Sequence, residues 1–112
     1  MTAISSCTPE TAACMVAAIL NDNPELSQAT AVILQEYLRA RKLHPCWPTD
    51  AVHAVNVITE EVGELAKDAN DFHWRGGSSA DRAGMRDEAI QVGAMAVRFL
   101  ANLNGYVPNI PK

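Results

Sequence analysis

Two acidic motifs, each placed where a helix is expected, constrain this chain more than any other feature. The first is Glu60–Glu64, with the letters EEVGE, and the second is Glu88–Gln91, with the letters EAIQ. Twenty-three residues lie between them, enough for the end of one helix, a turn and the start of the next. Residues three apart share one face of a helix. The spacing therefore predicts a helical hairpin on which oxygen-bearing side chains converge.

The segment after Glu88 is apolar around almost its whole helical circumference, which predicts a buried helix. An unpaired carboxylate in such surroundings is costly unless a cation meets it. Magnesium prefers oxygen ligands, and manganese is a substitute, so we expect Glu61, Glu64 and Glu88 to be metal ligands, with Gln91 adding a carbonyl oxygen. The apolar residues are Ala89, Ile90, Val92, Gly93, Ala94, Met95, Ala96, Val97, Phe99 and Leu100.

Hydrophobic periodicity and capping residues predict an all-α bundle of about four helices. The expected helices cover residues 9–21, 25–42, about 50–73 and 80–103. Their N-caps are Thr8 for the first, Thr49 or Asp50 for the third, and Ser78 or Ser79 for the fourth. We expect one domain over residues 1–112, with an extra N-terminal helix (1–24), a core (25–104) and a tail (105–112).

The third expected helix is amphipathic. Its apolar face is predicted to pack in the core and consists of Ala51, Val55, Ile58, Val62, Leu65, Ala66, Ala69 and Phe72. The opposite side carries His53, Glu60, Glu61, Glu64, Asp68 and Asp71.

Composition limits the class of protein. The chain has 112 residues, 48% of them apolar, and a formal charge of −4. Its acidic balance and lack of a basic patch disfavour a nucleic-acid polymer as partner. Three cysteines, Cys7, Cys14 and Cys46, match neither a zinc site nor a disulfide framework and indicate a reducing compartment. Without a signal sequence or a membrane-spanning stretch, a cytoplasmic protein with no membrane partner is expected.

Other residues near the motifs are candidates for the chemistry of phosphates. Glu60 is the candidate to orient or deprotonate a water, with Glu61 beside it as a second catalytic candidate. Basic and aromatic residues that could grip phosphates or stack on a base are Lys67, Arg75, Arg98, Trp47 and Trp74. Residues of these types are also common on solvated helix faces or over a core. A di-iron bundle is disfavoured because neither Glu64 nor Glu88 is followed by histidine at the third position, and His44, His53 and His73 are scattered.

From Leu26 to Leu103, the chain resembles the MazG-like nucleotide pyrophosphohydrolases, part of the all-α NTP pyrophosphatase group. The resemblance rests on Glu60–Leu65, which matches the EExxE signature, and on the spacing to Glu88. It implies hydrolysis of a nucleoside triphosphate to the monophosphate and pyrophosphate, as in nucleotide-pool cleaning. It also implies Glu61, Glu64 and Glu88 as magnesium ligands, and a homodimer or homotetramer. The chain departs from the family at Gln91, where the pattern has aspartate.

Two other interpretations stay open from the sequence. Gln91 removes one negative charge from the expected metal site, which favours a nucleotide-binding or regulatory module with weak or no turnover. A helical interaction protein with a solvated acidic face is the third interpretation.

Overall fold

The computed structural model describes residues 8–110, and these fold into helices without a strand. The helices are α1 (Pro9–Asn21), α2 (Pro24–Leu43), α3 (Ala51–Trp74) and α4 (Ser79–Ala101), followed by η1, a 3-10 helix (Leu103–Gly105). The predicted all-α class is therefore confirmed, and each helix lies where periodicity placed it. No helix in this range is long and apolar enough to cross a membrane.

The helix starts follow from side-chain caps. The hydroxyl of Thr8 accepts from the Thr11 amide at 3.2 Å, and the carboxylate of Asp50 accepts from the Val52 amide at 2.7 Å. Ser78 and Asp81 form a reciprocal capping box at the start of α4. These caps confirm Thr8 and decide the two open choices in favour of Asp50 and Ser78. The fourth helix ends earlier than predicted because the backbone tightens into η1 after Asn102.

The chain divides into two compact units, one up to Ala31 and one from Val32 onward. The boundary between the units falls inside α2. The first unit holds α1 and the first two turns of α2. The second holds the rest of α2 with α3, α4 and η1, and it contains both acidic motifs.

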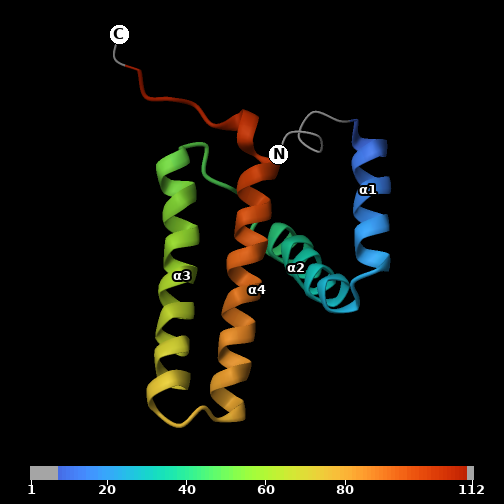
Figure 1. Ribbon diagram of the computed structural model, residues 1–112. Helices are drawn as coiled ribbons and strands as arrows, with labels where there is room; N and C mark the ends of the chain where they lie inside the picture. The colour runs from blue at the N-terminus through green and yellow to red at the C-terminus, as the bar shows by residue number, and fades with distance from the viewer. Residues whose placement is uncertain (1–7, 111–112) are drawn as a thin grey trace. The chain divides into compact units, whose positions relative to one another are not determined.

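Helices α3 and α4 form the predicted antiparallel hairpin and run side by side (Figure 1). The turn between them contains Gly76 and Gly77, whose φ angles are 103° and 61°. Backbone in this left-handed region favours glycine, because a side chain there clashes with its own backbone. The two glycines thus let a short connection reverse the chain and place the EEVGE and EAIQ motifs on neighbouring helices.

The core of the second unit is small and lies where α2, α3 and α4 meet. Ala40, Ala94 and Met95 are buried there, and the partly buried hydrophobic residues against them are Tyr37, Trp47, Val57 and Ile58. Ala54 of α3 is also fully buried. A Cβ on Gly93 would come within 2.8 Å of the Ile33 side chain, so glycine at this position permits the close approach of α2 to α4.

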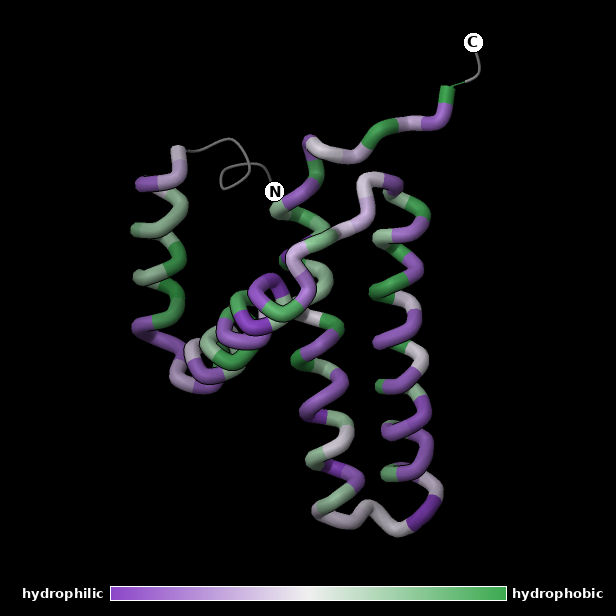
Figure 2. Tube along the Cα trace, turned by 180° about the vertical axis from the view of Figure 1, so that it is seen from behind, coloured by the Kyte–Doolittle hydropathy of each residue, from purple (hydrophilic) through white to green (hydrophobic). Residues whose placement is uncertain are grey.

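The prediction of a fully buried fourth helix is wrong for the single chain. Leu100 is 68% exposed, and only Ala94, Met95 and Arg98 of α4 are buried. On α3, Val55 and Val62 of the predicted core face are also exposed, by 46% and 45%. Within this unit α4 has neighbours on only part of its circumference, which leaves apolar residues of both helices facing outward; green and purple segments alternate along them in Figure 2.

Candidate functional site

A cavity of about 460 Å³ opens between the second half of α2, the loop that follows it, α3 and α4. It is the region to which the predicted site residues Glu61, Gln91, Trp47 and Arg98 all contribute. Its remaining lining residues are Glu36, Arg39, Ala40, His44, Cys46, Pro48, Val57 and Met95. Acidic and basic side chains thus share one partly apolar hollow, as expected of a site for a charged organic ligand.

Glu61 of α3 meets Glu88 of α4 at the edge of this cavity. Burial raises the pKa of the Glu61 carboxyl, and the adjoining Glu88 carboxyl raises it further, through a shared hydrogen bond and through its charge. The charges of Glu64 and Glu60 act in the same direction. Like charges held this close favour the neutral form of one partner or the arrival of a cation. The two motifs are therefore joined in the structure through one residue of each.

Gln91 has a different neighbour from the one expected. Its side chain lies near Glu36 of α2, while Arg39 donates two hydrogen bonds to the same carboxylate, Nε to Oε1 at 2.8 Å and Nη2 to Oε2 at 2.6 Å. Arg39, and after it Gln91, lowers the pKa of Glu36 despite its partial burial. The amide of Gln91 thus faces α2 beside the cavity.

Among the described residues of this unit, Arg98 is the buried charged side chain, with only 4% of its surface exposed. Its guanidinium donates to the backbone carbonyl of His44 and lies over the Trp47 ring, 4.9 Å from the ring centre. No carboxylate among residues 8–110 forms an ion pair with it at 4 Å or closer. A buried cation balanced only by a carbonyl and an aromatic face favours an anion in the adjoining cavity.

The other predicted substrate-binding residues lie outside the lining of this cavity. Trp74 is 75% exposed, with His73 packed edge-on against it. Arg75 pairs loosely with Asp71 at 3.6 Å on the surface, and Lys67 is exposed. Glu60 and Glu64 are exposed as well, and His53 lies 3.4 Å from the capping carboxylate of Asp50.

The predicted cage of three carboxylates is not assembled. No three acidic, histidine or cysteine side chains in the described part of the chain lie close enough to hold a metal ion among themselves. Glu64 stays exposed on α3, and Gln91 is turned to Glu36. What the structure offers is the pair Glu61 and Glu88, and one or two carboxylates are the usual protein contribution to a magnesium ion that also holds phosphates and waters.

Sequence reasoning missed Glu36, Arg39 and Tyr106. Glu36 lies on the second helix one turn from Ile33 and Ala40, so a carboxylate next to the core-facing residues was the available signal. Tyr106 accepts a hydrogen bond from the indole Nε1 of Trp47 at 2.8 Å. This pair is 59 residues apart in the chain, and no local pattern marks it.

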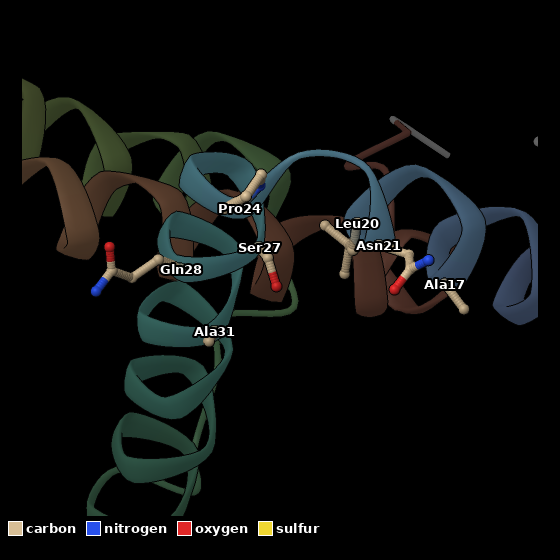
Figure 3. Close-up of a pocket in the computed structure, with 7 residues that line it drawn as sticks. All are labelled: Ala17, Leu20, Asn21, Pro24, Ser27, Gln28 and Ala31. Carbon is tan, nitrogen blue, oxygen red and sulfur yellow. The ribbon is translucent and has the colours of Figure 1, made fainter.

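Other hollows lie beyond this cavity. A smaller cavity of about 250 Å³ shares Trp47 and Arg98 with the first and is otherwise lined by Tyr37, Arg41, Pro45, Ala101 and Asn102. In the first unit, an open groove follows the junction of α1 and α2 and is lined by Ala17, Leu20, Asn21, Pro24, Ser27, Gln28 and Ala31 (Figure 3). No charged side chain lines this groove, so it lacks the groups that phosphate chemistry needs.

Cys14 and Cys46 are free and exposed. Cys7 lies outside the described residues. Comparison with protein-family models, with curated proteins and with solved structures finds no match.

Proposed function

We propose that this protein is a MazG-like pyrophosphohydrolase that uses magnesium to hydrolyse a nucleoside triphosphate to the monophosphate and pyrophosphate. The observation that supports this most is the Glu61 and Glu88 pair, supplied by two helices, at the edge of a cavity that also holds a buried arginine. Two adjoining carboxylates attract a divalent cation, and the arginine attracts an anion. A metal-bound polyphosphate satisfies both requirements.

The residues present fit magnesium in a specific way. Glu61 and Glu88 would hold the ion, with Glu64, on the same helix as Glu61, as the third carboxylate named by the resemblance. Gln91 adjoins Glu36 in this structure, so it would add its carbonyl oxygen to the metal only by turning away from Glu36. When bound, magnesium would screen the phosphate oxygens from the acidic side chains and polarise the phosphorus centre.

The chain's own side chains divide the remaining tasks. Glu61 borders the cavity and its pKa is raised, whereas Glu60 is exposed to solvent. A carboxylate that coordinates magnesium is not free to accept a proton, so Glu61 would act as a ligand, and Glu60 remains the candidate to orient or deprotonate an attacking water. Arg98 neutralises charge on the phosphates from inside the cavity. The Trp47 ring, which Arg98 covers on one face, offers an apolar surface to the nucleoside.

A second function, nucleotide binding without turnover, is favoured by one observation. The Gln91 amide adds no negative charge to the site and is engaged with Glu36. In that case the cavity binds the nucleotide and magnesium, but the weaker metal site does not support hydrolysis.

The test is a screen of ribo- and deoxyribonucleoside triphosphates for pyrophosphate release, with and without magnesium. We expect metal-dependent release that Glu61→Gln and Glu88→Gln abolish. Asp87→Asn is the matched control, because Asp87 adjoins Glu88 on α4 but is exposed and outside the cavity lining. Nucleotide binding without pyrophosphate release would support the second function. If neither binding nor release is detected, both are wrong, and the helical interaction protein remains.

We also propose that a second copy of the chain covers the exposed apolar residues of α3 and α4. Val52, Val55 and Val62 of α3, Leu100 of α4 and Leu103 of η1 are exposed hydrophobic residues. Association would remove their side chains from water, and each Å² of apolar surface buried in this way would stabilise the assembly by roughly 25 cal/mol. Light scattering after size exclusion should give a dimer or tetramer, and Val62→Glu should convert it to a monomer; a monomeric wild type would refute the assembly.

A further inference from the structure

The segment after α4 is attached to the loop between α2 and α3 by specific bonds. The Tyr106 hydroxyl accepts from the indole Nε1 of Trp47 at 2.8 Å and donates to the Phe99 carbonyl at 3.1 Å. Its ring lies against the Phe99 ring with centres 4.8 Å apart. One residue on, the Val107 amide donates to the Thr49 carbonyl at 3.0 Å. Tyr106 and Val107 thus contact both the loop and the last turn of α4.

Trp47 connects Tyr106 to the cavity, because it bonds to Tyr106 and lines the cavity. It lines both the large and the small cavity, and its ring supports the guanidinium of Arg98. Arg98 in turn donates to the carbonyl of His44, three residues before Trp47 in the same loop. The contacts therefore run from Tyr106 through Trp47 to Arg98, the group assigned to the phosphates above.

The indole N–H has limited ways to satisfy its hydrogen-bonding requirement. Indole nitrogen donates but cannot accept, and a partly buried donor without a partner is costly. The Tyr106 hydroxyl is held by Phe99 with its oxygen turned to the indole, so it fixes the rotation of the ring. Without that oxygen, the indole regains a hydrogen bond by turning its N–H toward water. The ring face that supports the Arg98 guanidinium turns with it.

We infer that Tyr106 is a positioning residue for the ligand cavity: its hydroxyl sets the orientation of Trp47 and thereby of Arg98, and so determines how tightly the site holds its nucleotide. This inference rests on the proposed function for its ligand. Tyr106 lies outside both acidic motifs, and none of its contacts described above is with Glu61 or Glu88. A role in substrate affinity is thus assigned to a residue away from the paired carboxylates.

The experiment uses Tyr106→Phe, which keeps the ring against Phe99 and removes only the hydroxyl. We expect KM for the preferred nucleoside triphosphate to rise about three- to tenfold, the range for one lost neutral hydrogen bond. The kcat should stay within about twofold, because Glu61 and Glu88 are untouched. In a Trp47→Phe background the same substitution should leave KM unchanged, because the residue through which Tyr106 acts is then absent.

A matched control separates positioning from general stability. Thr8→Ala removes the N-cap of α1 in the other unit and should cost stability on the order of 1 kcal/mol. We expect Thr8→Ala to lower the melting temperature without changing KM. If it raises KM as much as Tyr106→Phe does, or if Tyr106→Phe leaves KM unchanged, the positioning role is refuted. An equal rise in KM in the Trp47→Phe background also refutes it.

A second measurement tests the inference independently of hydrolysis. The chain has two tryptophans, so Trp74→Phe leaves Trp47 as the single fluorophore. In that background, Tyr106→Phe should shift the emission of Trp47 to longer wavelength and increase its quenching by iodide. Unchanged emission and quenching would overturn the inference even if the wild type hydrolyses nucleotides. A shift in a protein that hydrolyses no nucleotide would refute the proposed function and retain the positioning of Trp47 by Tyr106.

Discussion

Gly93→Ala should loosen the contact between α2 and α4 that brings Glu36 to Gln91. An ideal Cβ at residue 93 would lie 2.8 Å from Cδ1, 3.0 Å from Cγ1 and 3.3 Å from Cγ2 of Ile33. Three atoms of one β-branched side chain would have to move together, and isoleucine has few rotamers in a helix. By contrast, a Cβ at Gly63 of α3 would meet nothing within 4 Å.

The two alanine substitutions share one favourable effect and differ in one unfavourable effect. Alanine in place of glycine inside a helix stabilises by roughly 0.5–1 kcal/mol at either position. Overpacking against Ile33 costs about 1–3 kcal/mol and applies only at residue 93. We therefore expect Gly63→Ala to stabilise the protein and Gly93→Ala to destabilise it, with a difference between the variants of about 1–3 kcal/mol.

Urea unfolding followed by circular dichroism measures both free energies of unfolding at a fixed protein concentration. Ile33→Ala removes all three clashing atoms, so the double variant should show a favourable coupling on the order of 1 kcal/mol relative to the sum of the single changes. Equal stabilisation by Gly63→Ala and Gly93→Ala would refute the reasoning, because it would mean that α2 does not approach α4 as closely as described.

Three other perturbations have defined outcomes. In metal-free buffer, Glu61→Gln should raise the melting temperature by a few degrees, because it removes a carboxylate whose pKa is raised by burial and by the charge of Glu88; a lower melting temperature would count against that repulsion. Gln91→Asp should bring a carboxylate against Glu36 and lower metal-free stability, while isothermal titration should show tighter magnesium binding if residue 91 can turn to the metal; equal affinities would exclude coordination there. Arg39, and after it Gln91, lowers the pKa of Glu36. This carboxylate therefore contributes stability that is complete above its unfolded pKa of about 4.3 and is lost as pH falls through the lower folded value. The wild type should lose more stability between pH 6 and pH 3 than Glu36→Gln does, and parallel curves of stability against pH would contradict the prediction.

Local signals in the sequence were sufficient for the helices and for the hairpin. Caps such as Ser78 with Asp81, the prolines around residues 45–48 and the glycines at 76 and 77 act over a few residues, so each could be recognised without knowledge of distant parts. The pairing of Glu61 with Glu88 also followed from the two motifs, since a short turn forces the helices to be neighbours.

The remaining features depend on contacts between distant segments. Periodicity could not show that Leu100 and Val62 stay exposed in the single chain, because an apolar stripe looks the same whether its partner is the same chain or another. Likewise, the role expected for Gln91 came only from its spacing to Glu88, whereas in the structure its neighbour is Glu36 of α2. The Tyr106 bond to Trp47 spans most of the second unit and has no sequence signature.

The separation of Tyr106 from Trp47 also sets an order of folding. Helices α3 and α4 are joined by a short turn, so their contacts close a small loop and should form early, whereas a bond across 59 residues closes a large loop and should form late. On the ribosome, Trp47 and both acidic motifs emerge before Tyr106 does. A nascent chain is thus expected to hold its paired carboxylates before Tyr106 fixes Trp47 in the wall of the cavity.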